Sequence, residues 1–240
     1  MIGTAGWSIA RKNAEAFPAE GTALERYARV FDAVEVNSSF YKPHRVSTWE
    51  KWAASTPDHF RFAVKVPKAI THQAKLVEVD GLIQSFVQEV GHLGTKLAVL
   101  LVQLPPKLGF DASVAEGFFE TLHGASKAAI ACEPRNASWF GEEADGVLAR
   151  LQVARVAADP ALGPAAAMPG GWRGLAYWRL HGSPVMYRSS YNDETIDAYA
   201  AQIQAAISEG IPAWCCFDNT ASSAATGDAL SLMARLRASG

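Results

Sequence analysis

The sequence predicts an α/β protein built as a single TIM-type (β/α) barrel, with eight parallel strands and an irregular connection between strands 6 and 7. Two observations carry this prediction. Short apolar or β-branched runs alternate with amphipathic runs along the whole chain, a pattern typical of βαβ units and a parallel sheet. Eight such runs favour a closed sheet over an open one, because the first turn, GTAGWS, lacks the GxGxxG spacing of a dinucleotide-binding loop.

The expected strands are eight short apolar segments. They span residues 2–7, 33–40, 60–67, 97–105, 128–135, 154–160, 175–182 and 213–220. Amphipathic patterns such as LIQSFVQEVGHLG and ETIDAYAAQIQAAISE lie between most of them and predict helices. The connection PALGPAAAMPGGWRG holds too much proline and glycine for a good helix, yet it is long enough to cross back over a sheet. We expect one domain over residues 1–240.

Composition narrows the classes of protein. The 240 residues are 49% hydrophobic and carry a net charge of 22 − 24 = −2, without the basic excess that usually accompanies nucleic-acid binding. Three cysteines, an odd number inside apolar runs, predict reduced core thiols. The start MIGTAGW lacks a leader pattern and no run could span a bilayer, so we expect a soluble cytoplasmic protein without a membrane partner. Composition does not predict an oligomeric state.

Polar side chains follow the apolar part of seven expected strands, near the carboxyl end of each. Because barrel closure brings these ends to one rim, where barrel enzymes keep their sites, we expect a pocket there. A paired ring of salt bridges is the alternative, since desolvated charges must pair or bind something. The residues are Glu35, Asn37, Lys65, Gln103, Glu133, Arg135, Asp159, Arg179, His181, Asp218 and Asn219.

The loops offer further candidates, each with a structural alternative. His72 is either an acid–base group or a surface hydrogen-bonding residue. Tyr187, Arg188 and Tyr191 form either a lid over an anionic ligand or an ordinary ordered loop. In NTASSAATG, after the eighth expected strand, small hydroxyl residues either bind an anion at a helix start or cap that helix.

Several of these motifs, taken in order, resemble the YecE-like family, also called the domain-of-unknown-function 72 family. They are GTAGWS, AVEVNSSFY, the run from WEKWAAS to KAITH, LLVQLPP, ACEPRNASW, YWRLHGSP, MYRSSY and FDNTASSAA. The resemblance implies a TIM-barrel-type fold and a family whose biochemical activity has not been established. Matched by motif, the implied positions are Glu35, Asn37, Ser38, Tyr41, Lys65, His72, Gln103, Glu133, Arg135, Arg179, His181, Gly182, Tyr187 and Tyr191.

Our leading hypothesis is an enzyme, a hydrolase or lyase, that performs acid–base chemistry on a small anionic ligand, a class that includes phosphorylated molecules. Glu133 or Glu35 would be the base and His181 the acid or proton shuttle. Lys65, Arg135 and Arg179 would hold the anion. No motif implies a cofactor. Side chains expected to complete the ligand site are Asn37, Tyr41, His72, Gln103, Tyr187, Arg188, Tyr191 and Asn219.

Two other functions remain open. The first is a metal-dependent phosphodiesterase resembling abasic-site endonucleases, which alone would require a divalent metal. Few histidines and interleaved Lys and Arg side chains count against it. The metal ligands of this phosphodiesterase would be Glu35, Glu133, Asp159, His181 and Asp218. The second function is a module that binds a ligand without turnover, because a fold does not dictate a function.

Overall fold

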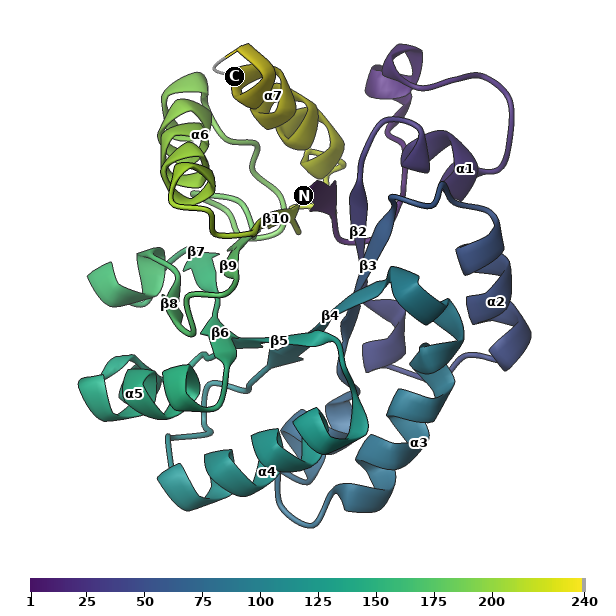
Figure 1. The fold of residues 1–240 in the computed structure, drawn as a ribbon. Coiled ribbons are helices and arrows are strands. Elements are labelled where there is room, and N and C mark those ends of the chain that lie inside the picture. Colours follow the sequence, from purple (N-terminus) through teal and green to yellow (C-terminus); the bar gives the residue numbers. More distant parts are fainter. Residues whose placement is uncertain (239–240) are drawn as a thin grey trace.

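A computed structural model describes residues 1–238, in which helices surround a central group of strands (Figure 1). The strands are β1 (Ile2–Thr4), β2 (Ala33–Val36), β3 (Arg61–Lys65), β4 (Leu97–Gln103), β5 (Ala129–Glu133), β6 (Val153–Arg155), β7 (Ala157–Asp159), β8 (Gly170–Gly171), β9 (Ala176–Leu180) and β10 (Ala213–Phe217). The α-helices are α1 (Ala23–Ala28), α2 (Val46–Ala54), α3 (Asp80–Val90), α4 (Ala112–Ala125), α5 (Glu142–Arg150), α6 (Asp193–Ser208) and α7 (Ala225–Ala238).

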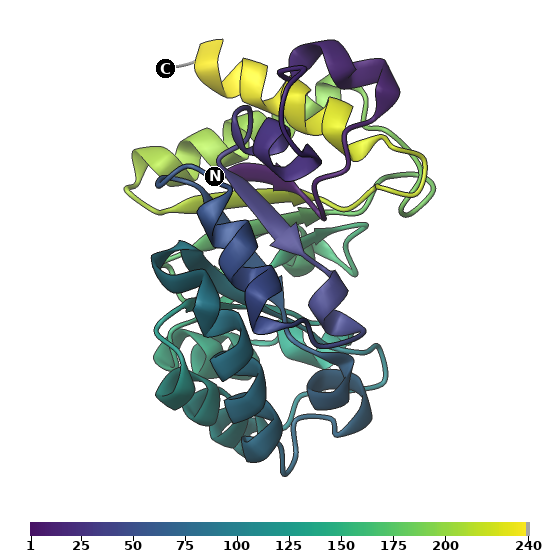
Figure 2. The ribbon, with the colours of Figure 1, turned by 90° about the vertical axis from the view of Figure 1, so that its right-hand side faces the viewer.

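The strands form two sheets, so the prediction of a single closed barrel of eight parallel strands is wrong. One sheet has four parallel strands in the order β1-β10-β9-β7. The other has six strands in the order β2-β3-β4-β5-β6-β8, and its last pair is antiparallel. Figure 2 shows the chain from the side, with β2 and the strands that follow it crossing below the N-terminal and C-terminal elements. The expected strands lie where the sequence places them, but their pairing is interrupted at two points.

The first interruption separates β1 from β2, which meet at one isolated bridge between Ala5 and Glu35. The physical reason is the Tyr27 hydroxyl of α1, which stands between the two backbones. It accepts from the Thr4 amide at 2.8 Å and donates to the Ala33 carbonyl at 3.0 Å. A side chain thus takes the place of a direct ladder bond, and the two sheets stay distinct along this line.

The second interruption divides the sixth expected strand. Its first half, β6, pairs with β5, whereas its second half, β7, pairs with β9 in the other sheet. The irregular connection then adds an antiparallel strand to β6, with Ala154 opposite Gly171. Gly171 has φ +62°, and a Cβ there would lie 2.6 Å from the Val153 carbonyl, so this close approach requires glycine.

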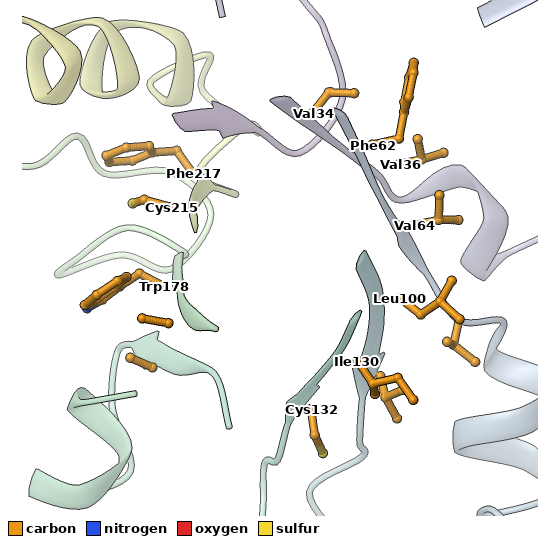
Figure 3. Packing of buried hydrophobic residues seen from close by; sticks show 14 of the residues in the cluster. Val34, Val36, Phe62, Val64, Leu100, Ile130, Cys132, Trp178, Cys215 and Phe217 are labelled. Carbon is orange, nitrogen blue, oxygen red and sulfur yellow. The ribbon is translucent and has the colours of Figure 1, made fainter. Parts of the chain in front are cut away.

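Alternation along the strands produces two apolar clusters. One face of the strands packs against the helices, and Figure 3 shows Val34, Val64, Leu100, Trp178 and Phe217 among these side chains. The opposite face forms a second cluster to which both sheets contribute. Its members are Ala33, Ala63, Val99, Leu101, Ala131, Ala154, Val156, Leu175, Tyr177, Trp214 and Cys216. The inner faces of the two sheets therefore share one apolar core.

Local signals explain where the helices begin. Thr22 and Glu25 form a capping box at the start of α1, and the Asn192 side chain accepts from the Thr195 amide at 2.9 Å at the start of α6. Within residues 1–238, no helix combines the length and the apolar character needed to cross a membrane.

Candidate functional site

Charged side chains form the layer directly above the inner apolar core. They occupy strand positions two residues beyond core members, and the two-residue period of a strand puts both on the same face. Examples are Ala131 followed by Glu133 on β5, and Tyr177 followed by Arg179 on β9. Strands of both sheets contribute, so residues far apart in the sequence meet at one place (Figure 1). The members are Glu35, Lys65, Glu133, Arg179, His181 and Asp218, with Arg135 beside them; we call these seven residues the charged cluster.

Arg179 lies at the centre of the charged cluster and is 1% exposed. Its Nε and Nη2 donate to Glu35 at 3.0 and 2.7 Å, and its Nη1 donates to Glu133 at 2.9 Å. Nη2 also lies 2.9 Å from Asp218 Oδ2. All three nitrogens of the guanidinium donate to carboxylates, and Nη2 also makes the ion pair with Asp218. The side chain of Arg179 is therefore committed to protein carboxylates.

Glu35 is equally committed. Besides Arg179, its Oε2 accepts from the Tyr177 hydroxyl at 3.1 Å, and the carboxylate is fully buried. Asn37 adds a further contact: with its amide nitrogen toward Glu35, it donates to Oε1 at 2.9 Å and accepts from Arg179 Nη2 at 3.3 Å. Both carboxylate oxygens thus have partners, which fits a positioning role for Glu35.

His181 connects two acidic side chains. Its Nδ1 lies 3.0 Å from Asp218 Oδ2, and its Nε2 lies 3.0 Å from Glu133 Oε1. Nε2 is also 2.7 Å from Arg135 Nη2. With the proton on Nδ1, the neutral ring can accept from Arg135; when both nitrogens carry protons, Nε2 can donate to Glu133 instead. The protonation state of His181 therefore decides which of the two it binds.

Two acids of the charged cluster, Glu133 and Asp218, have pKa values below their usual ones. Burial alone raises the pKa of Glu133, but Arg179, His181 and Arg135 together bring it well below its usual value. Burial likewise raises the pKa of Asp218, and Arg179 and His181 bring it below its usual value. With His181 left aside, formal charge is balanced, because Glu35, Glu133 and Asp218 face Lys65, Arg135 and Arg179, giving 3 − 3 = 0.

Arg135 lies at the outer edge, with 14% of its side chain exposed. One end of its guanidinium forms a short ion pair with Glu133. Its Nε, however, is buried without a hydrogen-bond partner among residues 1–238. An unpaired donor on a cation is costly, so Nε is the atom in the charged cluster most in need of an acceptor.

Lys65 is the second cation with spare capacity. It is 8% exposed, and its Nζ lies 4.2 Å from the centre of the Phe40 ring. Within the part of the chain that the structure describes, no carboxylate oxygen lies within 4.0 Å of this amine. Burial, followed by the neighbouring charge of Arg179, lowers the pKa of Lys65 to about 8. A fraction of the amine is thus uncharged near neutral pH.

Three further predicted ligand residues lie around this layer. Gln103 ends β4 opposite Glu133 and is half-buried. His72 contacts Thr71 at 2.8 Å through Nδ1 and the Phe40 ring edge to face, and burial, then Lys65, lowers its pKa. Tyr41 is 68% exposed and faces Lys68, away from the carboxylates.

The loop after β9 is fixed by hydrogen bonds. The Tyr191 hydroxyl donates to Asp159 at 2.7 Å and accepts from the Gly182 amide at 2.8 Å. Asn219 is buried and donates to the Ser189 carbonyl at 2.8 Å. These contacts favour the interpretation of 183–191 as an ordered loop, held by its own Tyr191 and by Asn219, which follows β10.

The other two predicted loop residues are exposed. The Tyr187 ring lies edge to face with the His181 ring, with the centres 5.5 Å apart, so it covers the imidazole from outside. Arg188 is exposed at the tip of the same loop. The loop after β10, with Thr220 and Ser223, lines a cavity of about 30 Å³. That volume suits about one water molecule, so the hydroxyl groups there fit capping better than phosphate binding.

The ligand set required by a metal-dependent phosphodiesterase is not assembled. Asp159 is engaged with Tyr191, and the oxygens of Glu35, Glu133 and Asp218 are turned toward Arg179. In residues 1–238, no group of three or more His, Cys, Asp or Glu side chains is arranged to hold a metal ion. A guanidinium occupies the position where such a cation would have to be.

Two residues that contact the charged cluster are not predicted from the sequence. Tyr177 supports Glu35, and the signal for it was present, because it precedes Arg179 by two residues on one strand. Phe40 covers Lys65, but an aromatic residue just after a strand gives no sign that it will face an amine.

Parts of this chain are similar in sequence to two curated proteins. The UPF0759 protein YecE of Escherichia coli strain K12 is 36% identical over 88 residues, which are 37% of this chain and 32% of that protein. The UPF0759 protein YunF of Bacillus subtilis strain 168 is 30% identical over 145 residues, 58% of this chain and 51% of that protein. The matched stretches thus span about a third and about half of these curated relatives.

A solved structure and a family model extend the likeness to the whole chain. A crystal structure of a DUF72 family protein from Enterococcus faecalis superposes with a TM-score of 0.82 at 20% identity, covering 98% of this chain and 94% of that one. At this identity the likeness concerns the fold. A family model described as "Protein of unknown function DUF72" matches residues 1–240. The chain therefore belongs to the DUF72 family.

Proposed function

We propose that this protein is an enzyme that performs acid–base chemistry on a small anionic molecule at the outer edge of the charged cluster. The observation that carries the proposal is the pair of cations without a full set of partners. Arg135 has a buried, unpaired Nε, and Lys65 has no carboxylate within 4.0 Å among residues 1–238. An anion that accepts from Arg135 Nε and lies near Lys65 would supply both missing partners.

The acid–base part of the proposal rests on His181. Asp218 fixes the proton on Nδ1, so Nε2 is the nitrogen that gives or takes a proton. An anion that draws Arg135 toward itself leaves Nε2 facing Glu133. Nε2 is then positioned to pass a proton between Glu133 and the bound molecule.

The other residues of the charged cluster have supporting roles in this proposal. Glu133 is closer to the proton path than Glu35, because its Oε1 contacts His181 Nε2. Glu35 and Arg179 hold one another and keep Glu133 and Asp218 in place. Asn37 and Gln103 are half-buried at the edge and complete the ligand site with Tyr187. Arg188 would assist in attracting an anion rather than in binding it.

The test uses a panel of small carboxylates and phosphates in a thermal-shift assay, followed by mass spectrometry of each stabilising compound. We expect at least one compound to raise the melting temperature of the wild-type protein and to be converted. Arg135→Gln should abolish the stabilisation, whereas the matched surface variant Arg173→Gln should keep it. Arg173 pairs with Glu209 and its side chain is 78% exposed.

Variants inside the charged cluster then separate binding from chemistry. His181→Gln and Glu133→Gln should retain the thermal shift and lose conversion, because each keeps a polar side chain but removes a proton-transfer group. Stabilisation without conversion in the wild-type protein identifies a binding module instead of an enzyme. A panel in which no anion stabilises the protein, or in which Arg135→Gln changes nothing, contradicts the proposed site.

A further inference from the structure

We infer that Lys65 is a nucleophile that forms a Schiff base with the carbonyl group of an anionic substrate, a small aldehyde or ketone bearing a carboxylate or phosphate. This inference rests on the proposed function, because it uses the same site and names the class of molecule bound there. It gives Lys65 a different role from the one in that proposal, where its amine only attracts the anion.

Position is the first argument. Lys65 ends β3, two residues after the core member Ala63, so its side chain rises from the inner face into the charged cluster. It is buried, and its backbone carbonyl accepts from the Ser39 hydroxyl at 2.7 Å. The root of the side chain is thereby held in a packed setting, which limits the directions open to Nζ.

The surroundings of the amine are the second argument. Buried lysines that serve as structural cations usually lie against carboxylates, but Nζ of Lys65 faces the ring of Phe40 at 4.2 Å. A cation–π contact offsets only part of the cost of burying an ion. This setting therefore raises the uncharged fraction of the amine above that of an exposed lysine, in line with a pKa lowered to about 8.

Acid–base groups lie near Lys65. Lys65 interacts electrostatically with Glu133 and Asp218, the two acids that hold His181 between them. Glu133 also forms the ion pair with Arg135, so the amine and the unpaired guanidinium atom face a common set of side chains. Glu133 is thus a common neighbour of the amine and of the guanidinium of Arg135, and in this proposal the carbonyl group meets Nζ while the acidic group of the substrate meets Arg135.

The reaction balances without an oxidant or reductant. The lone pair of neutral Nζ forms a bond to the carbonyl carbon, and the two hydrogens of the amine leave with the carbonyl oxygen as water. Protonation of the imine nitrogen, through His181 or solvent, gives an iminium cation. This cation restores the positive charge that Lys65 lacks as a free amine, so the balance with the three carboxylates is kept.

The test compares glyoxylate, an aldehyde with a carboxylate, and acetaldehyde, an aldehyde without one, each with cyanoborohydride at pH 7. Peptide mapping by mass spectrometry then locates the reduced adducts. At this pH about a tenth of an amine with a pKa of about 8 is uncharged, against about one part in 2,500 for a lysine with the ordinary value of about 10.4. Allowing for slower access to a buried amine, we expect Lys65 to react with glyoxylate at least tenfold faster than the exposed Lys68.

Controls make the two proposals separable. Lys65→Met, with its fold checked by circular dichroism, should lose the fast adduct, and Lys68→Met should keep it. If Lys65 reacts equally fast with both aldehydes and Arg135→Gln has no effect, the nucleophile stands and the anion site fails. If glyoxylate stabilises the protein but Lys65 reacts no faster than Lys68, the anion site stands and the nucleophile is excluded. A rate of modification by acetaldehyde that rises with a midpoint near pH 10, instead of near 8, also excludes it.

Discussion

Replacing Arg179 by methionine tests whether this side chain holds the charged cluster together. The substitution keeps an apolar stem of similar length but removes the partner of three carboxylates, two of which, on Glu35 and Glu133, are fully buried. Breaking a buried ion pair by removing one member costs about 3–5 kcal/mol, a large part of the roughly 5–15 kcal/mol by which a domain is stable. We expect Arg179→Met to lose at least about 3 kcal/mol at pH 7.

The loss should depend on pH in a defined direction. In the native protein the pKa of Glu133 lies well below its usual value, so this group contributes stability above the pKa of the unfolded chain and loses it as the pH falls through the folded value. Without Arg179 the same carboxyl stays buried with fewer cations, its folded pKa rises, and that contribution shrinks. The difference in unfolding free energy between the two proteins should therefore be larger at pH 7 than at pH 4.5.

Urea unfolding followed by tryptophan fluorescence measures both quantities. The matched control is Arg173→Met, which removes the exposed pair with Glu209 and should cost about 0–1 kcal/mol. Adding Glu35→Gln to Arg179→Met should recover part of the loss, because one unpaired charge is then gone. A cost for Arg179→Met no larger than that for Arg173→Met, or a cost that does not change with pH, would refute the central role of Arg179.

Two further substitutions test how the sheets and the loop after β9 are held. Gly3→Ala should cost about 1–3 kcal/mol or more in urea unfolding, because a Cβ there would lie 2.1 Å from the Ala33 carbonyl oxygen; an unchanged midpoint would mean that β1 and β2 are not in such close contact. Tyr191→Phe should leave the Gly182 amide without its acceptor and speed its hydrogen exchange, since both bonds of the hydroxyl are lost; unchanged exchange would remove Tyr191 as a strut.

Strand positions could be predicted from the sequence, but strand pairing could not. The expected strand 97–105 contains β4 (Leu97–Gln103), and the expected strand 128–135 contains β5 (Ala129–Glu133), because buried parallel strands are continuous apolar runs. The closed barrel failed for reasons that lie outside local pattern. The Tyr27 hydroxyl belongs to a helix, and nothing in the spacing of that helix indicates that it will stand between Thr4 and Ala33.

In the candidate site, too, the sequence pattern predicts which way the side chains face but not which charged side chains pair. The two-residue period is enough to predict that Glu35, Glu133 and Arg179 face one way from their strands. It does not indicate which charges will satisfy one another, since that depends on side-chain reach and on the register between strands of different sheets. Arg135 and Arg179 look alike in the sequence, yet Arg135 keeps an unpaired Nε, whereas all three guanidinium nitrogens of Arg179 donate to carboxylates.

The two arginines of the charged cluster therefore differ in role: Arg179 holds the carboxylates together, and Arg135 is the one available to a ligand. A ligand that competed for Arg179 would have to displace buried carboxylates, each of which would then lose its cation at a cost of several kcal/mol. A ligand that accepts from the unpaired Nε of Arg135 need not displace any carboxylate, and one that draws Nη2 away competes only with His181 and Glu133. Binding at the outer edge therefore costs less than binding at the centre. A closed ring of salt bridges, the structural alternative, accounts for Glu35 and Arg179. It does not account for the unpaired Nε of Arg135, or for the amine of Lys65, which has no carboxylate within 4.0 Å among residues 1–238.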